Sequence, residues 1–232
     1  MLYGYYMFDW TYLLVIVGLI LSLAASAHVK NTFRKYNQVR SMRNLTGALA
    51  AQKVLQSAGI YDVTIERVSG ELTDHYDPRT KTLRLSNSTY ASNSVAAVCV
   101  AAHECGHAVQ DRVGYAPLSL RSSLVPAANI GSSLGWPIFF FGWIFSFQPL
   151  ITAGIVLFTL AVLFQLVTLP VEFNASSRAM RLLEDTHLLG EQELSAGRKV
   201  LGAAAMTYVA SLAASALQLL RLVILSGGRR RR

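Results

Sequence analysis

Four stretches of apolar residues divide the chain, and each is long enough to form a helix that crosses a bilayer. They cover residues 10–27, 124–147, 150–171 and 200–225. A transmembrane helix needs about 20 mainly apolar residues, because each residue adds about 1.5 Å across a hydrocarbon core about 30 Å thick. The pattern therefore predicts a mainly α-helical integral membrane protein with about four transmembrane helices.

The more polar segment 28–123 predicts a small domain that contains both helices and strands. Asn44-Leu45-Thr46 is typical of a helix start, and Gly59 of the stop of that helix. Polar and apolar residues alternate over 62–66, which predicts a strand. Residues 71–76 and 81–85 flank the turn sequence Asp77-Pro78-Arg79-Thr80, so we expect a hairpin.

A second helix of this domain is expected after Ser92, Asn93 or Ser94, each of which can cap its first turn. Its apolar part, 95–102, is too short to cross a bilayer, so the pattern favours a helix buried in the core. The strand before it, 82–86, can pair with an extended substrate peptide or with an ordinary hairpin partner. The domain is therefore predicted to be α+β.

Two features of the later apolar runs predict how their helices pack. Gln148-Pro149 predicts a tight turn between two antiparallel spans. Gly131 and Gly135 have the spacing of a close helix contact, although two small residues in an apolar helix would look the same. After the third run, residues 172–199 are expected to form a helix outside the membrane.

The charges around the first apolar run predict the orientation of the chain. No Lys or Arg precedes this run, whereas Lys30, Arg34, Lys35, Arg40 and Arg43 follow it. Basic residues accumulate on the cytosolic side, so we expect an uncleaved anchor with an external N-terminus and a cytosolic α+β domain. The alternative is a secretory signal with a cleavage site at Ala25-Ser26-Ala27. Four crossings from an external N-terminus would leave the basic tail, 226–232, outside the cell. Either this tail is an exception to the cytosolic preference of basic residues, or the last apolar segment does not fully cross the membrane.

Composition supports residence in a membrane and narrows the choice of partners. The chain is 53% hydrophobic and only 15% charged, which is more apolar than an ordinary soluble domain. The net charge is +8, but the basic residues lie beside apolar runs and in the tail. Anionic lipid headgroups, rather than nucleic acid, are therefore the expected partners. Cys99 and Cys105 fall on different faces of one predicted helix, so we expect no disulfide between them.

The sequence His103-Glu104-Cys105-Gly106-His107 carries the candidate chemistry. Histidines four residues apart on a helix point the same way, so both imidazoles can bind one zinc ion, and Glu104 can take a proton from the attacking water. The alternative is a pair of buried structural histidines beside an incidental glutamate. Cys105 is displaced from the metal-facing direction, which favours a packing role.

A catalytic zinc ion usually has three protein ligands, so a third ligand is needed. Val113 stands six residues after His107, where metzincins have a third histidine, and the chain lacks the Asp-Gly pair expected in site-2 proteases. The remaining common solution is a glutamate on a second helix, and Glu172 is the best candidate. Two predicted crossings separate it from His107, which returns it to the same side of the membrane. Four other acidic residues on that side fit the solvated face and end of the same helix: Glu184, Asp185, Glu191 and Glu193.

Three segments resemble the bacterial membrane zinc metallopeptidases of the YugP type, a gluzincin-like family. They are Leu72-Thr73-Asp74-His75-Tyr76-Asp77-Pro78, the segment around His103-Glu104, and residues 169–175. More distantly, Glu172-Phe173-Asn174-Ala175 is similar to the glutamate helix of the HtpX and Ste24 membrane proteases. In those proteases an Asp follows the Ala and orients a zinc-bound histidine. Ser176 stands at that place here, so the candidates for the orienting role are Asn174, Ser176 and Asp111.

The resemblance implies a multi-pass enzyme of the bacterial plasma membrane, with a zincin-like domain at the cytosolic face and one Zn2+ per chain. His103, His107 and Glu172 would hold the metal, and Glu104 would be the catalytic base. The implied substrates are membrane or membrane-proximal proteins, whose peptide bonds would be hydrolysed. Four residues are candidates for stabilising the oxyanion: His75, Tyr76, His187 and Arg178.

Two other classes of function stay open. A non-catalytic membrane adaptor would keep the zinc site for structure, but it has no use for the carboxylate of Glu104. A metal sensor or carrier should have ionisable residues within several spans, whereas the predicted spans contain only Arg221, near a span end.

Overall fold

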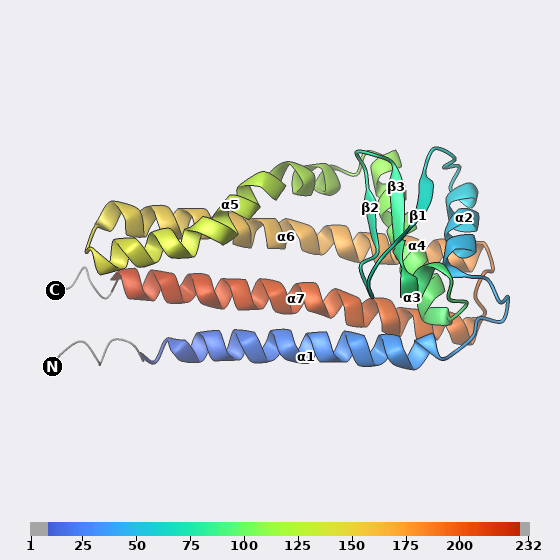
Figure 1. The fold of residues 1–232 in the computed structure, drawn as a ribbon, viewed down its shortest axis with the longest axis horizontal. Helices are drawn as coiled ribbons and strands as arrows, with labels where there is room; N and C mark the ends of the chain where they lie inside the picture. Colours follow the sequence, from blue (N-terminus) through green and yellow to red (C-terminus); the bar gives the residue numbers. More distant parts are fainter. Residues whose placement is uncertain (1–8, 228–232) are drawn as a thin grey trace. The chain divides into compact units, whose positions relative to one another are not determined.

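The computed structural model describes residues 9–227 and is mainly helical, with one small mixed sheet (Figure 1). The predicted fold class is therefore confirmed. Most of the predicted basic tail, 228–232, lies outside the described residues. In chain order the elements are α1 (Tyr12–Asn37), α2 (Gly47–Ser57), β1 (Thr64–Val68), β2 (His75–Asp77), β3 (Thr82–Ser86), α3 (Asn87–Tyr90), α4 (Val95–Arg112), α5 (Ala116–Ile144), α6 (Gln148–Asp185) and α7 (Glu191–Gly227).

The chain divides into two compact units. The first, which we call the apolar unit, comprises the described residues 9–26, 120–169 and 207–227. The second, which we call the mixed unit, comprises Ala27–Ser119 and Pro170–Met206. The sheet and the helices α2, α3 and α4 belong to the mixed unit.

Within residues 9–227, four helices are long and apolar enough to cross a membrane: α1, α5, α6 and α7. Their apolar side chains are poorly covered by protein: Leu13, Ile20 and Leu23 of α1 expose 58–62% of their surface. Exposed apolar surface of this extent fits contact with lipid. Each of these helices extends past its predicted apolar stretch at one end or both, and the predicted boundaries of the spans stay predictions.

Close backbone contact joins α5 to α6 inside the apolar unit. A Cβ atom added at Gly131 would lie 2.2 Å from the carbonyl oxygen of Leu157, and one at Gly135 would lie 3.0 Å from the backbone nitrogen of Phe158. The interpretation of this pair as a helix contact is therefore confirmed. Small residues allow two helix backbones to approach each other within a membrane.

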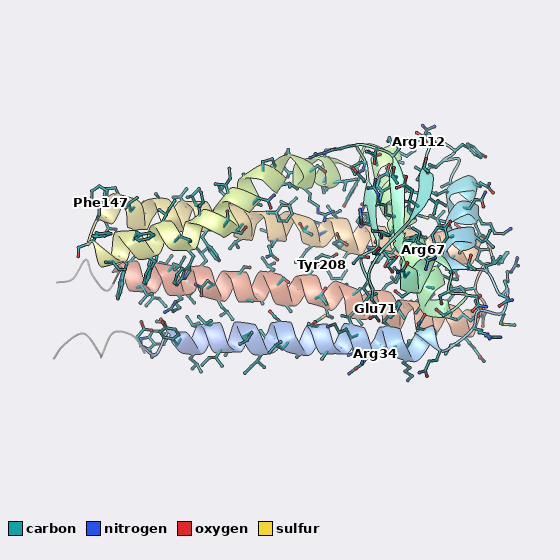
Figure 2. The ribbon with its side chains drawn as sticks, in the orientation of Figure 1. Arg34, Arg67, Glu71, Arg112, Phe147 and Tyr208 are labelled. Carbon is teal, nitrogen blue, oxygen red and sulfur yellow. The ribbon has the colours of Figure 1, made fainter. Side chains whose placement is uncertain are left out.

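The turn between α5 and α6 precedes the predicted position. Residues 145–147 form it, and Figure 2 shows Phe147 at this end of the two helices. Gln148-Pro149 instead opens α6, so the prediction of a turn at these two residues is wrong. Proline is favourable in the first turn of a helix, because the N–H that it lacks would have no partner there.

Arg221 is buried in the apolar unit, with 7% of its surface exposed. Its Nε donates to Oγ1 of Thr11 at 3.2 Å, and its guanidinium lies 4.1 Å from the ring centre of Tyr12. The positive charge of Arg221 therefore contacts Thr11 and Tyr12 at the start of α1 and does not extend into solvent.

The sheet of the mixed unit has the order β1-β3-β2, with β3 in the centre (Figure 1). The expected hairpin is present but short, because only 75–77 pair with 82–84 in the antiparallel direction. The strand expected at 62–66 begins two residues later, at Thr64, and pairs with β3 in parallel. β3 pairs with β1 along one edge and with β2 along the other. The prediction of an ordinary hairpin partner is therefore confirmed, and the alternative, that a substrate peptide pairs with this strand, is wrong.

Local caps begin the helices of the mixed unit where the sequence predicts. The Thr46 side chain accepts a hydrogen bond from Leu49 N at 3.3 Å, and Gly59 has a φ of +69° after the end of α2. Ser94 caps α4 by accepting from Ala97 N at 3.1 Å.

The core between the sheet and the helices α2 and α4 includes Leu83, Leu85, Val54 and Val98. The short helix α3 was not predicted.

The predicted helix 172–199 is wrong, because two helices share this segment. The first ends at Asp185 and the second begins at Glu191, with Leu188 and Leu189 buried between them. Glu193 is not solvated: its carboxylate accepts from Gly190 N and from Met42 N, each at 2.8 Å. A glutamate that caps the start of its own helix in this way fixes where the helix begins.

Candidate metal centre

The backbones of α4 and α6 touch beside the candidate ligands. A Cβ atom added at Gly106 would lie only 2.4 Å from the carbonyl oxygen of Ala175. Both positions are buried, and the small neighbours Ala102 and Ala179 are buried as well. This run of small residues lets the two helices approach closely enough for side chains on one helix to reach those on the other.

His103, His107 and Glu172 converge at this contact. The two histidine rings lie edge to face with their centres 4.9 Å apart, as expected for residues one helical turn apart. Oε2 of Glu172 lies 3.2 Å from Nε2 of His103 and 3.6 Å from Nε2 of His107. Glu172 is 2% exposed and His107 is 8% exposed. The passage of the chain through α5 and the first part of α6 thus brings the predicted third ligand beside the first two.

This donor set fits a zinc ion. One ligand atom from each of the three residues lies within 4.8 Å of the others. Two neutral imidazole nitrogens and one carboxylate oxygen are ligands that zinc prefers, and three protein ligands leave a coordination position open. A carboxylate as buried as that of Glu172 also requires a positive partner, which a cation would supply. His103, His107 and Glu172 therefore form a candidate zinc site.

The second ring nitrogen of each histidine also has a partner. Nδ1 of His103 lies 3.1 Å from Oγ of Ser176, and Nδ1 of His107 lies 3.0 Å from Oε1 of Gln110. Asn174, another candidate for the orienting role, contacts Gln110 rather than a histidine. Gln110 is not among the predicted site residues. Its position three residues after His107 on the same helix was the available signal.

Asp111, the remaining candidate for the orienting role, faces a different set of side chains. Tyr76 donates its hydroxyl to Oδ2 of Asp111 at 2.8 Å, and the ammonium of Lys81 forms an ion pair with the same carboxylate. Burial, together with the hydrogen bond to Asp111, raises the pKa of Tyr76 above its usual value. The phenol is therefore protonated at neutral pH, and its proton is directed at Asp111.

The three other candidates for stabilising the oxyanion, Arg178, His75 and His187, lie in three different places. Nε of Arg178 donates to Oδ1 of Asn174 at 2.8 Å, so this arginine belongs to the network behind the ligands. His75 is exposed and lies with Nδ1 2.9 Å from Thr73 O. His187 follows the end of α6, and the helix rises by about 20 Å between Glu172 and Asp185 alone.

Glu104 lies on α4 between the two histidines and is 7% exposed. Burial raises the pKa of its carboxyl above the usual value, while the neighbouring His103 and His107 act in the opposite direction. A raised pKa brings a carboxylate closer to the range in which it can accept and return a proton near neutral pH.

Cys105 is fully buried on the side of α4 that faces α2. Its Sγ lies 3.6 Å from the carbonyl oxygen of Ala51, and burial raises the pKa of the thiol well above its usual value. Cys99 is also free and fully buried. These contacts are those of small packing residues.

Comparison with known proteins assigns the chain to a family. Residues 11–227 match the family model described as "Putative neutral zinc metallopeptidase". The chain belongs to this zinc metallopeptidase family. This chain is 44% identical over 212 residues to the "Putative membrane protease YugP" of Bacillus subtilis (strain 168). The match covers 91% of this chain and 94% of that relative. No solved structure matches the chain.

The family assignment confirms several predictions. The resemblance to the YugP type is confirmed, as is the class of enzyme, a zinc metallopeptidase. The expected cofactor is confirmed as zinc, with His103, His107 and Glu172 as its candidate site.

Proposed function

We propose that this zinc metallopeptidase is a membrane-bound endopeptidase that cleaves membrane or membrane-proximal proteins at the cytosolic face. The proposal depends on the convergence of three side chains within 4.8 Å: His103, His107 and Glu172. The two histidines lie on α4 and the glutamate on α6, and α5 lies between these helices in the chain. The four apolar helices keep such an enzyme in the bilayer, where nearby substrates are concentrated.

The residues of the chain would divide the work of peptide hydrolysis. His103, His107 and Glu172 would hold the zinc ion, which supplies a Lewis acid and lowers the pKa of water toward neutrality. Glu104 would accept the proton that the attacking water loses, and would return it to the nitrogen of the leaving amine. Its low exposure of 7% would limit exchange of that proton with bulk water.

The cytosolic orientation is supported by exposed basic residues at the end of α1. Lys30, Arg34 and Lys35 are exposed there, and Figure 2 shows Arg34 on this part of the helix. Basic residues next to a span favour the cytosolic side, and anionic lipid headgroups would be their partners.

One edge of the sheet suggests where an extended substrate would bind. Because β3 is central, the short strand β2 occupies one edge, and its Tyr76 is linked to α4 through Asp111. A peptide added to β2 by backbone hydrogen bonds would run beside the metal helix.

A catalytic role of Glu104 is tested by replacing its carboxylate with an amide of the same shape. We expect Glu104→Gln to keep its zinc and its helical content but to lose cleavage of a membrane-protein substrate by about 10²–10⁴-fold. The measurements are metal analysis, circular dichroism and proteolysis by the full-length protein in nanodiscs.

The alternative is a non-catalytic zinc-containing adaptor that grips other membrane proteins. It would leave Glu104→Gln equal to the wild type in every assay, including capture of its partners. Equal proteolysis by the two proteins would exclude Glu104 as the base, and absence of proteolysis by both would favour the adaptor.

A further inference from the structure

Gln110 is a fully buried amide on α4 that joins both helices of the candidate zinc site. Its side chain is 0% exposed. Its Oε1 lies 3.0 Å from Nδ1 of His107, and its Nε2 lies 2.8 Å from Val171 O and 3.0 Å from Oδ1 of Asn174. Both amide donors and the amide oxygen therefore have partners, as a buried amide requires.

The chemistry of the partners on α6 fixes the orientation of this amide. The carbonyl oxygen of Val171 can only accept, so the group of Gln110 that faces it must be the NH2. The guanidinium of Arg178 can only donate, and its Nε lies 2.8 Å from the Asn174 side chain. The Asn174 atom that faces both Arg178 and Gln110 is therefore the oxygen, a second acceptor for the Gln110 NH2. Both contacts turn Oε1 of Gln110 toward His107.

The orientation of Gln110 determines where His107 carries its proton. An amide oxygen only accepts, so Nδ1 of His107 must be the N–H donor in this contact. In a neutral imidazole the lone pair is then at Nε2, the atom that lies 3.6 Å from Oε2 of Glu172. A zinc ion held by His107 through Nε2 needs that lone pair.

We propose that Gln110 is a positioning residue that holds His107 in its metal-binding tautomer, and that Asn174 and Arg178 keep Gln110 in the required orientation. The inference rests on the proposed zinc site. The two histidines differ in this respect, because the Ser176 hydroxyl next to His103 can either donate or accept and does not select a tautomer by itself. His107 is thus the pre-oriented ligand, and His103 is the adjustable one.

The first test measures zinc affinity by competition with a chromophoric chelator, using the full-length protein in detergent. Gln110→Met has a similar length but no acceptor, so we expect its zinc affinity to fall by about 10–100-fold. Gln110→Glu retains an oxygen that accepts the Nδ1 proton, and in its protonated form the second oxygen can still donate to Val171 O, so we expect it to bind zinc more tightly than Gln110→Met by about tenfold or more. Gln165→Met is the matched control, because Gln165 of α6 donates to Ser215 at 3.2 Å in the apolar unit. It should bind zinc as the wild type does.

A second readout follows the proton itself. Cobalt(II) in place of zinc shifts the ring N–H signals of bound histidines out of the crowded region of the proton NMR spectrum. The wild type and Gln110→Glu should show one such signal that exchanges slowly with D2O, and Gln110→Met should lose it or exchange it rapidly. A change in packing alone would not separate Gln110→Glu from Gln110→Met in this way.

The outcomes separate failure of the inference from failure of the proposed site. If the wild type binds no zinc, the proposed site fails. If the wild type binds zinc and Gln110→Met binds it equally well with the same slow signal, the positioning role is overturned. Should Gln110→Met not fold, the wild-type cobalt spectrum decides, because a spectrum without a slowly exchanging ring proton would also overturn it.

Discussion

At the scale of single residues, Glu172 carries the charge on which zinc binding depends. It is the anionic ligand of the three, and with 2% exposure it has little access to water. Removing a ligand should cost more than the 10–100-fold typical of a residue behind a ligand, so we expect Glu172→Gln to weaken zinc binding by more than about 100-fold. Metal analysis and chelator competition measure this loss. Glu184→Gln, an exposed change on the same helix, is the control and should bind zinc normally.

Most of the residues that converge at the site follow from the sequence, because their signals are local or topological. The four-residue spacing of His103 and His107 fixes one face of a helix, and an even number of crossings allows Glu172 to return to it. Gln110 could not be found in this way. A polar residue one turn after a ligand is common on helices, and only the burial of its amide and the carbonyl of Val171 reveal its role.

At the scale of elements, the contact between α4 and α6 should be sensitive to a single methyl group. A Cβ atom at Gly106 would lie 2.4 Å from Ala175 O, and backbone on both sides leaves no flexible side chain to move. We expect Gly106→Ala to separate the helices, to lower the free energy of unfolding by about 1–3 kcal/mol and to weaken zinc binding. Thermal unfolding with and without zinc measures both effects.

The matched control for this contact is Gly202→Ala on α7, where an added Cβ meets nothing within 4 Å. Replacing a glycine inside an open helix position should stabilise the protein by about 0.5–1 kcal/mol. If Gly106→Ala behaved like Gly202→Ala, the close approach of α4 and α6 would be contradicted.

The helix starts were predictable from sequence, whereas the pairing of strands was not. Thr46 and Ser94 cap their helices through bonds to residues three positions away, which a local pattern encodes. The parallel pairing of β1 with β3 depends on contacts between residues far apart in the chain, so the position of β3 in the centre was missed. The start of α7 is capped by a local bond from Gly190 N to Glu193, whereas the second bond to this carboxylate, from Met42 N, joins residues far apart in the chain.

At the scale of the whole molecule, the four candidate spans predict which positions share a side of the membrane. Arg112 at the end of α4 and Glu184 near the end of α6 are exposed, and Gln148 is exposed at the start of α6. We expect Arg112→Cys and Glu184→Cys to react with an impermeant maleimide only in inverted vesicles, and Gln148→Cys only in intact cells. The native Cys99 and Cys105 are buried and should give little background. Labelling of Arg112→Cys and Glu184→Cys from opposite sides would contradict two crossings between them.

The separation of the metal ligands along the chain has a mechanical consequence. His107 and Glu172 are joined through the whole length of α5 and the first part of α6, so an ion bound to both would act as a cross-link that closes a long loop. Closing a loop of this kind reduces the entropy of the unfolded chain, and metal binding is then coupled to folding. Occupancy by zinc would therefore hold the two ends of this loop together as well as equip the enzyme for hydrolysis, and a chain that loses its ion would become easier to unfold as it becomes inactive.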